Sequence, residues 1–303
     1  MSNLPYEIVD HIVDLLHDSQ IPLRNCCFVS KSWIPRTRMH LFAEIRFQTA
    51  MNLQSWKQTF RDPSTSPACY TKSLLIGSEV LTDADADGNG WIEGFSSVVH
   101  LELVGQDTCG WRVARVLFRG FSVIQSFRVD FCASADFSSS QIFDLILSFP
   151  LLDHLSVTDY RMLDEYHMGD NYTDSDEVSA VIQPSSLLMF TGSLKLRLQE
   201  GIGPVVRRLL SLPGGVHFRK LNLAWSNTED ILLMIALVKR CSHTLESLEI
   251  TCVTIRRTSI GYLCSHGSNS FLFPGGPETA SFNLLKATKL QDAVFLSESA
   301  SVK

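Results

Sequence analysis

The chain lacks the segments that would place it in or across a membrane. No uncharged apolar stretch approaches the roughly 20 residues that a membrane-spanning helix needs. The start, Met1-Ser2-Asn3-Leu4, has neither the basic segment nor the apolar run of a secretory signal. We therefore expect a protein of the cytoplasm or the nucleus that does not act at a membrane.

The chain also contains fewer basic than acidic residues. The 303 residues include 26 Lys and Arg against 32 Asp and Glu, which gives a formal net charge of −6. Proteins that bind nucleic acids generally show a basic surface. The composition therefore predicts no nucleic-acid partner and favours another protein as the partner.

The motifs that mark common enzyme classes are missing as well. There is no Gly-rich phosphate loop, no HExxH and no GxSxG. Single histidines such as His100, His154 and His217 stand beside predicted strands, where a structural role is expected. We expect no catalytic residues, no cofactor and no enzymatic activity.

The eight cysteines do not form a disulfide framework or the closely spaced pairs of a structural zinc site. Two Cys-x-His pairs, Cys241-Ser242-His243 and Cys264-Ser265-His266, flank Cys252. Zinc could use such ligands, but the usual Cys-x2–4-Cys spacing is absent. The sequence predicts reduced thiols, mostly buried as small core residues, and no metal site.

The chain does contain a dense group of apolar residues in its first 46 positions. Pro5 suits the start of a helix, and Ile8, Val9, Ile12, Val13, Leu15 and Leu16 follow at helical spacing. Pro22 opens a second helix that is expected to carry Leu23, Cys26, Cys27 and Val29 inward. Ser30 can cap a third helix, with Trp33 pointing back into the bundle. Three helices this small bury little core, so a partner is expected to cover part of them.

The order of three short motifs resembles the F-box. The motifs are Leu4-Pro5-x-Glu7-Ile8, Cys27-x-Val29-Ser30-Lys31-Ser32-Trp33 and Leu41-Phe42-x-x-Ile45. In that family the module holds a Skp-type adaptor and, through it, a cullin-RING ubiquitin ligase whose catalytic cysteine belongs to other subunits. The resemblance implies that residues 1–46 dock the adaptor, through Leu4, Pro5, Ile8, Ile12, Leu23, Val29 and Trp33.

Residues 47–70 are predicted to form a helical linker. Phe47, Met51, Leu53, Trp56 and Phe60 suggest a helix, and two prolines in a Ser/Thr-rich stretch end it. We therefore place a domain boundary near residue 65 and expect a second domain over residues 71–303.

That second domain shows internal repetition. A strand-like unit with apolar residues at i−3, i and i+2 recurs about every 26 to 28 residues, and apolar helical stretches lie between units at Ile142–Leu147, Val205–Leu212 and Ile231–Val238. Such spacing predicts an α/β fold with a parallel sheet. The full units are Val98-Leu101-Leu103, Ile124-Phe127-Val129, Leu152-Leu155-Val157, Phe218-Leu221-Leu223 and Leu245-Leu248-Ile250; Leu74-Ile76 and Leu194-Leu196 are partial units.

The period is similar to that of divergent leucine-rich repeats, which form a solenoid. The usual Asn or Cys five residues after the central Leu occurs only as Cys132; the other positions hold Gln106, Tyr160, Gln199, Ser226 and Val253. Another α/β layer fold with evenly spaced strands remains the alternative. Residues 284–296 look like one more unit without a polar cap, so the array is expected to be incomplete or closed by another chain.

Two segments interrupt the period. Six acidic residues gather between Leu155 and Leu194, which indicates a solvated loop or, alternatively, a surface that selects a basic partner. Residues 254–284 are read as an inserted loop around Pro274-Gly275-Gly276-Pro277. The six acidic residues are Asp164, Glu165, Asp170, Asp174, Asp176 and Glu177.

One further segment, Asp85 to Ser96, matches part of an EF-hand calcium loop. Asp85, Asp87, Asn89 and Gly90 fit it, but Ser96 replaces the bidentate Glu that completes the calcium shell. A turn between repeats explains the same residues, because Asp, Asn and Gly tolerate positive φ.

Together these features predict the substrate-recognition subunit of an SCF-type ubiquitin ligase, with its F-box on the adaptor and its repeats on an unidentified target protein. The alternatives are a non-degradative scaffold built from the same parts and a calcium-regulated protein-binding module.

Overall fold

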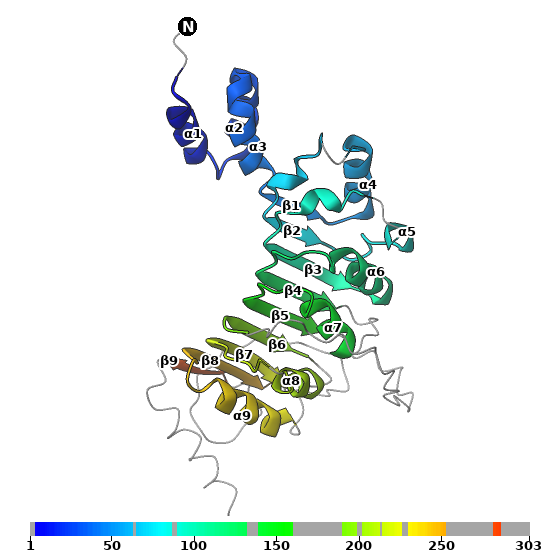
Figure 1. Ribbon diagram of the computed structural model, residues 1–303, viewed down its shortest axis with the longest axis vertical. Coiled ribbons are helices and arrows are strands. Elements are labelled where there is room, and N and C mark those ends of the chain that lie inside the picture. The colour runs from blue at the N-terminus through cyan, green and yellow to red at the C-terminus, as the bar shows by residue number, and fades with distance from the viewer. Residues whose placement is uncertain are drawn as a thin grey trace, which may run out of the picture. The chain divides into compact units, whose positions relative to one another are not determined.

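The computed structural model describes residues 4–62, 65–86, 90–131, 139–159, 190–198, 202–212, 214–225, 230–252 and 281–285. The chain forms two compact units. Unit 1 comprises Met1–Val129 with Ser134–Asp136 and Ser148–Leu151. Unit 2 comprises Asp130–Ala133, Phe137–Leu147 and Leu152–Lys303. Figure 1 labels the elements of both units.

Unit 1 begins with a helical module made of α1 (Tyr6–Leu15), α2 (Gln20–Val29), the 3-10 turn η1 (Lys31–Trp33) and α3 (Ile34–Leu41). Pro5 is the N-cap of α1, and Ser30 caps η1 by accepting the backbone N–H of Ser32. Both positions confirm the helix starts expected at Pro5 and Ser30. The core of the module consists of Val9, Val13 and Leu23, packed with Leu16, Trp33 and Leu41.

The sheet of unit 1 starts earlier than the sequence indicates. Strand β1 (Glu44–Phe47) pairs in parallel with β2 (Ser73–Ile76), with Ile45 opposite Leu74. The helix expected in the linker is present as α4 (Ala50–Thr59). Residues 44–70 therefore supply the first strand and helix of the α/β array, and a boundary near residue 65 does not mark where the sheet begins.

The remaining elements of unit 1 follow the predicted period. β2 pairs in parallel with β3 (His100–Gln106), with Leu74 opposite Leu101, and β4 (Ser126–Phe131) is next in strand order. The expected core positions Leu74, Ile76, Leu101 and Leu103 are buried. The connections contain η3 (Pro67–Tyr70), α5 (Asp83–Ala86), η4 (Glu93–Phe95) and α6 (Thr108–Phe118).

Gln106 has a structural role that the sequence pattern did not predict. Its side chain is buried, and its Nε2 donates to the backbone oxygens of Ile76, Gly77 and Val104 at 3.2, 3.1 and 3.1 Å. Two of these acceptors lie at the end of the neighbouring strand β2, Ile76 as its last residue and Gly77 directly after it. Gln106 therefore hydrogen-bonds the backbone of the neighbouring strand–helix unit. In leucine-rich repeats an Asn or Cys at this position is expected to make that kind of contact.

Gln106→Leu is expected to lower the free energy of unfolding of unit 1 by about 2 kcal/mol. Leucine has a similar volume, but it leaves buried carbonyl oxygens without a donor, and each unpaired group costs roughly 1–3 kcal/mol. Urea denaturation followed by circular dichroism measures the change. Gln125→Leu, at an exposed site, is the control. Equal midpoints for the two variants would contradict the role assigned to Gln106.

Unit 2 continues the alternation of strand and helix. The expected helices are confirmed as α7 (Ser139–Ile146), α8 (Gly203–Leu210) and α9 (Asp230–Cys241). The predicted phase is also confirmed, because Leu155, Leu194, Leu221 and Leu248 stand opposite one another in parallel register. The parallel strands of this unit are β5 (His154–Asp159), β6 (Ser193–Arg197), β7 (Lys220–Trp225) and β8 (Ser247–Cys252).

The last strand departs from the expected repeat. β9 (Ser281–Leu285) pairs with β8 in the antiparallel direction, with Leu284 opposite Leu248. A further parallel unit beginning at Leu284 is therefore wrong for the described part of that segment. An antiparallel neighbour ends the parallel progression, because the chain runs back along β8 instead of crossing over through a helix.

Free thiols are found at Cys26, Cys27, Cys69, Cys109 and Cys241, as expected. Only Cys26 and Cys241 are buried, so burial is less general than the sequence suggested. Every helix within the described ranges is too short or too polar to span a bilayer. The acidic segment at 164–177 and residues 254–280 lie outside the described residues.

Candidate docking surface

Helix α1 carries an exposed apolar stripe beside its buried one. Leu4, Ile8 and Leu15 are exposed, whereas Val9 and Val13 are buried. The sequence suggested that Ile8, Val9, Val13 and Leu15 share one broad apolar face. The structure instead turns Val9 and Val13 toward the core and leaves Ile8 and Leu15, about two helical turns apart on the same side, facing solvent.

Helix α2 exposes apolar side chains as well. Ile21 and Phe28 are separated by seven residues, so they lie on the same side of the helix, and both are exposed, Phe28 to 87%. Val29 is 63% exposed, so it does not point inward as expected. Leu23 and Cys26 make the buried side of α2. The outer side of this helix is therefore apolar and is not covered by any of the residues that the structure describes.

The predicted adaptor contacts fall into three groups. Leu4, Pro5, Ile8 and Val29 are exposed, and Ile12 and Trp33 are half-buried. Leu23 is 1% exposed and belongs to the core of the module. It therefore supports the surface from within, and the assignment of Leu23 as a contact residue is corrected.

Four exposed side chains of α1 and α2 were not assigned to the surface from the sequence, namely Tyr6, Leu15, Ile21 and Phe28. The spacing of seven residues between Ile21 and Phe28, opposite Leu23 and Cys26, was the available signal. Large apolar side chains left exposed on a helix are typical of protein interaction sites.

An ion-pair cluster locks α1 against α3. The Arg36 guanidinium donates to both carboxylate oxygens of Asp14, at 2.7 and 2.6 Å, and His40 Nε2 lies 2.7 Å from Asp14 Oδ1. Hydrogen bonds from Arg36 and then His40 hold the pKa of Asp14 well below its usual range. Bidentate pairing of this kind fixes orientation as well as distance. The exposed stripe on α1 is therefore held in a defined position relative to α3.

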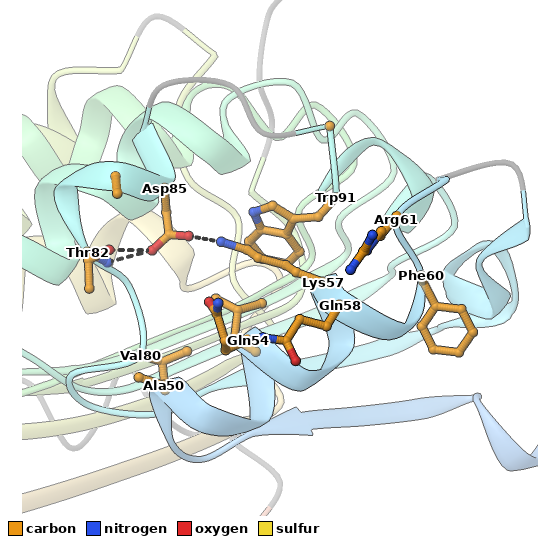
Figure 2. A pocket seen from close by; sticks show the side chains of 13 residues that line it. Ala50, Gln54, Lys57, Gln58, Phe60, Arg61, Val80, Thr82, Asp85 and Trp91 are labelled. Carbon is orange, nitrogen blue, oxygen red and sulfur yellow. Dashed lines mark hydrogen bonds and ion pairs between the residues drawn. The ribbon is translucent and has the colours of Figure 1, made fainter.

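A separate cavity of about 620 Å³ lies beside α4 in unit 1. Figure 2 shows the Lys57 ammonium directed at the Asp85 carboxylate, next to the ring of Trp91. The other Asp85 oxygen accepts from the Thr82 backbone N–H and hydroxyl, each at 2.8 Å. Lys57 and Asp85 therefore neutralise each other at the cavity wall.

The same contacts involve the first residue of the calcium-loop pattern. Asp85, its first position, is 4% exposed and engaged by Lys57 and Thr82. Asp87 and Asn89 lie outside the described residues. Within the described ranges no group of three His, Cys, Asp or Glu side chains is placed to hold a metal ion.

The structure describes some, but not all, of the residues considered as zinc ligands. Cys241 is buried, and its thiol lies 3.8 Å from the backbone oxygen of Val216, while His243 is exposed. Burial raises the pKa of the Cys241 thiol. Cys264 and His266 lie outside the described residues.

No protein-family model, no curated protein and no solved structure matches the chain. Function is therefore inferred from the motifs and the geometry. The exposed apolar side chains of α1 and α2, together with Leu4 and Pro5 before them, form the strongest candidate site, and we call them the α1–α2 surface.

Proposed function

We propose that the chain is the substrate-recognition subunit of an SCF-type ubiquitin ligase. Its N-terminal module, resembling the F-box, docks a Skp-type adaptor through the α1–α2 surface. The strand-and-helix array, resembling divergent leucine-rich repeats, holds the target protein. The chain then acts by proximity, because it raises the effective concentration of target lysines near the charged conjugating enzyme.

The exposure of the α1–α2 surface is the observation that carries this proposal. Leu4, Ile8 and Val29, taken from the F-box-like motifs, are 54%, 48% and 63% exposed. Burying a large apolar side chain fully stabilises an interface by roughly 1.5–3 kcal/mol. A module with a small core of its own and several such side chains in solvent is suited to a partner that covers them.

A binding measurement with purified Skp-type adaptor tests the proposal. The full chain is immobilised, and the adaptor is titrated against wild type, Leu4→Ala/Pro5→Ala and Ile8→Ala. Each variant is expected to weaken binding by about 2 kcal/mol, or roughly 30-fold, because it removes a central apolar contact. Phe28→Ala is expected to act in the same direction.

Leu232→Ala is the matched control, because Leu232 on α9 is 76% exposed but lies in unit 2. It should leave adaptor binding unchanged. The proposal fails if wild type does not bind the adaptor at micromolar concentration, or if Ile8→Ala and Leu232→Ala bind equally. Melting curves by circular dichroism show whether each variant is folded.

A further inference from the structure

Five basic side chains gather at one edge of unit 2, where α8 and α9 end and β7 and β8 begin. The connections from helix to strand, residues 211–219 and 242–246, contain one acidic residue, Glu246. Arg207 is not part of the group, because its Nη2 lies beside Gly203 at the start of α8. The five are Arg208 at the end of α8, Arg219 and Lys220 where β7 begins, and Lys239 and Arg240 at the end of α9, and we call them the basic edge.

Backbone hydrogen bonds hold the two connections side by side. The backbone oxygen of Arg219 accepts from the N–H groups of Glu246 and Ser247, at 2.7 and 3.0 Å. A Cβ added at Gly215 would lie 3.1 Å from Arg240 Nη2, so the guanidinium at the end of α9 lies against the connection that follows α8. Helices α8 and α9 are also in contact (Figure 1). The cations that follow α8 and those that end α9 therefore share one edge of the unit.

The side chains of the basic edge are exposed, and none of them forms an ion pair with a residue that the structure describes. Cations elsewhere differ, since Arg36 pairs with Asp14 at 2.6 Å and Arg128 pairs with Glu102 at 2.9 Å. Five cations against Glu246 leave an excess of four positive charges, although the chain as a whole carries −6. A positive surface on an acidic protein selects negatively charged partners and repels basic ones.

The helix ends account for only part of this arrangement. Cations in the last turn of a helix are favoured by the helix dipole, which suits Arg208, Lys239 and Arg240. Arg219 and Lys220 lie outside the helices, in a connection and at the start of a strand. Unpaired like charges that lie close together repel one another, so a partner that neutralises them is expected to bind there.

The chemistry of the basic edge favours a protein segment over a nucleic acid. Proteins that bind single strands stack the bases on exposed aromatic side chains. The large aromatic side chains exposed in the described part of the chain, Tyr6 and Phe28, belong to unit 1. Three of the five cations are arginines, whose planar guanidinium binds a carboxylate through two parallel hydrogen bonds. Neighbouring Asp and Glu side chains therefore match the edge.

We propose that the basic edge binds an acidic segment of the target protein. Asp and Glu carboxylates of the segment pair with Arg219 and Arg240, where the two connections meet, and with the other cations of the edge. Exposed ion pairs are individually weak and are screened by salt, so binding depends on several pairs acting together. The inference rests on the proposed receptor function, of which it names the substrate class.

Fluorescence anisotropy with a labelled peptide of alternating glutamate and serine measures this binding on the full chain at low ionic strength. Arg219→Gln/Arg240→Gln is expected to weaken binding about fivefold, because it removes two exposed ion pairs. Arg61→Gln/Arg119→Gln is the matched control, because it removes the same charge from exposed sites in unit 1 and should leave binding nearly unchanged. Added salt should weaken binding to wild type more than binding to Arg219→Gln/Arg240→Gln.

Several outcomes would overturn the inference. They are no saturable binding of the peptide to wild type, equal binding of a peptide of alternating lysine and serine, and equal loss in the two double variants. A single-stranded oligonucleotide or phosphatidylserine vesicles that bind as tightly as the acidic peptide would also overturn it. If Arg219→Gln/Arg240→Gln does not fold, Lys220→Gln/Lys239→Gln is compared with the same control.

Adaptor binding by the same proteins separates this inference from the proposed function. Wild type that binds the adaptor but not the peptide refutes this inference alone. Wild type that binds the peptide but not the adaptor refutes the proposed function and leaves the acidic-segment site in place.

Discussion

Phe95→Ala is expected to lower the free energy of unfolding of unit 1 by about 4 kcal/mol. Phe95 is fully buried, with ring centroids 6.3, 5.7 and 5.8 Å from those of Phe47, Trp56 and Trp91. Truncation of a buried aromatic ring to alanine typically costs 3–5 kcal/mol, because it removes apolar burial and leaves a cavity. Edge-to-face contacts such as that between Phe95 and Phe47 add to this loss.

Urea denaturation followed by tryptophan fluorescence measures the change, because four of the five tryptophans, at positions 33, 56, 91 and 111, belong to unit 1. Phe28→Ala is the control: its ring is 87% exposed, so the free energy of unfolding should change by no more than about 0.5 kcal/mol. A Phe95 variant as stable as the Phe28 variant would show that the aromatic cluster is not packed as described.

The aromatic cluster also explains why residues 47–70 are not a separate linker. Phe47 ends β1 and Trp56 lies on α4, and both rings contact Phe95. The sequence correctly indicated the helix over these residues. It did not indicate β1, because a four-residue strand offers only Ile45 and Phe47 as an alternating signal and Ile45 also fitted the preceding helical motif.

The strand array was predictable because each unit repeats the same short pattern at nearly constant spacing. Leu194, Leu221 and Leu248 are 27 residues apart, and the structure places them opposite one another. Repetition turns many weak local signals into one strong one. The direction of β9 carried no such signal, since its apolar residues alone do not distinguish parallel from antiparallel pairing.

The docking surface was only partly predictable. Apolar residues cover so much of α1 that periodicity alone does not decide whether Ile8 or Val9 faces the core. Leu23 of α2 decides it by packing against Val9 and Val13, which is a contact between helices. Gly192 is a similar case, because a Cβ there would overlap the backbone oxygen of Asp153, 39 residues earlier. Such constraints arise from tertiary packing and leave no mark in the local sequence.

Lys57→Met is expected to lower the free energy of unfolding of unit 1 by about 3 kcal/mol at neutral pH. Methionine keeps most of the aliphatic contact that the Lys57 side chain makes beside Trp91. It leaves the Asp85 carboxylate, which is 4% exposed, without its cation. Removing one partner of a buried ion pair typically costs 3–5 kcal/mol, because the remaining charge is no longer compensated.

The pH dependence of this loss identifies its cause. Burial raises the pKa of Asp85, but hydrogen bonds from Lys57 and Thr82 outweigh burial and leave the pKa below its usual value of about 4. In wild type the carboxylate therefore contributes stability above about pH 4, which is lost as the pH falls through the lowered pKa. Without Lys57 burial dominates, so the pKa is raised and the carboxylate destabilises the fold wherever it is ionised. The difference in stability between wild type and Lys57→Met should be largest near pH 7 and shrink toward pH 4.

The double variant Lys57→Met/Asp85→Asn separates the charge from the packing. An asparagine oxygen still accepts from the Thr82 N–H and hydroxyl, while the uncompensated charge is gone. This variant should recover most of the stability lost in Lys57→Met at pH 7, and its stability relative to wild type should not change between pH 5 and 7. Urea denaturation at several pH values measures both effects. A double variant as unstable as Lys57→Met, or a single variant whose loss does not vary with pH, would show that packing beside Trp91 and not the buried charge is the cause.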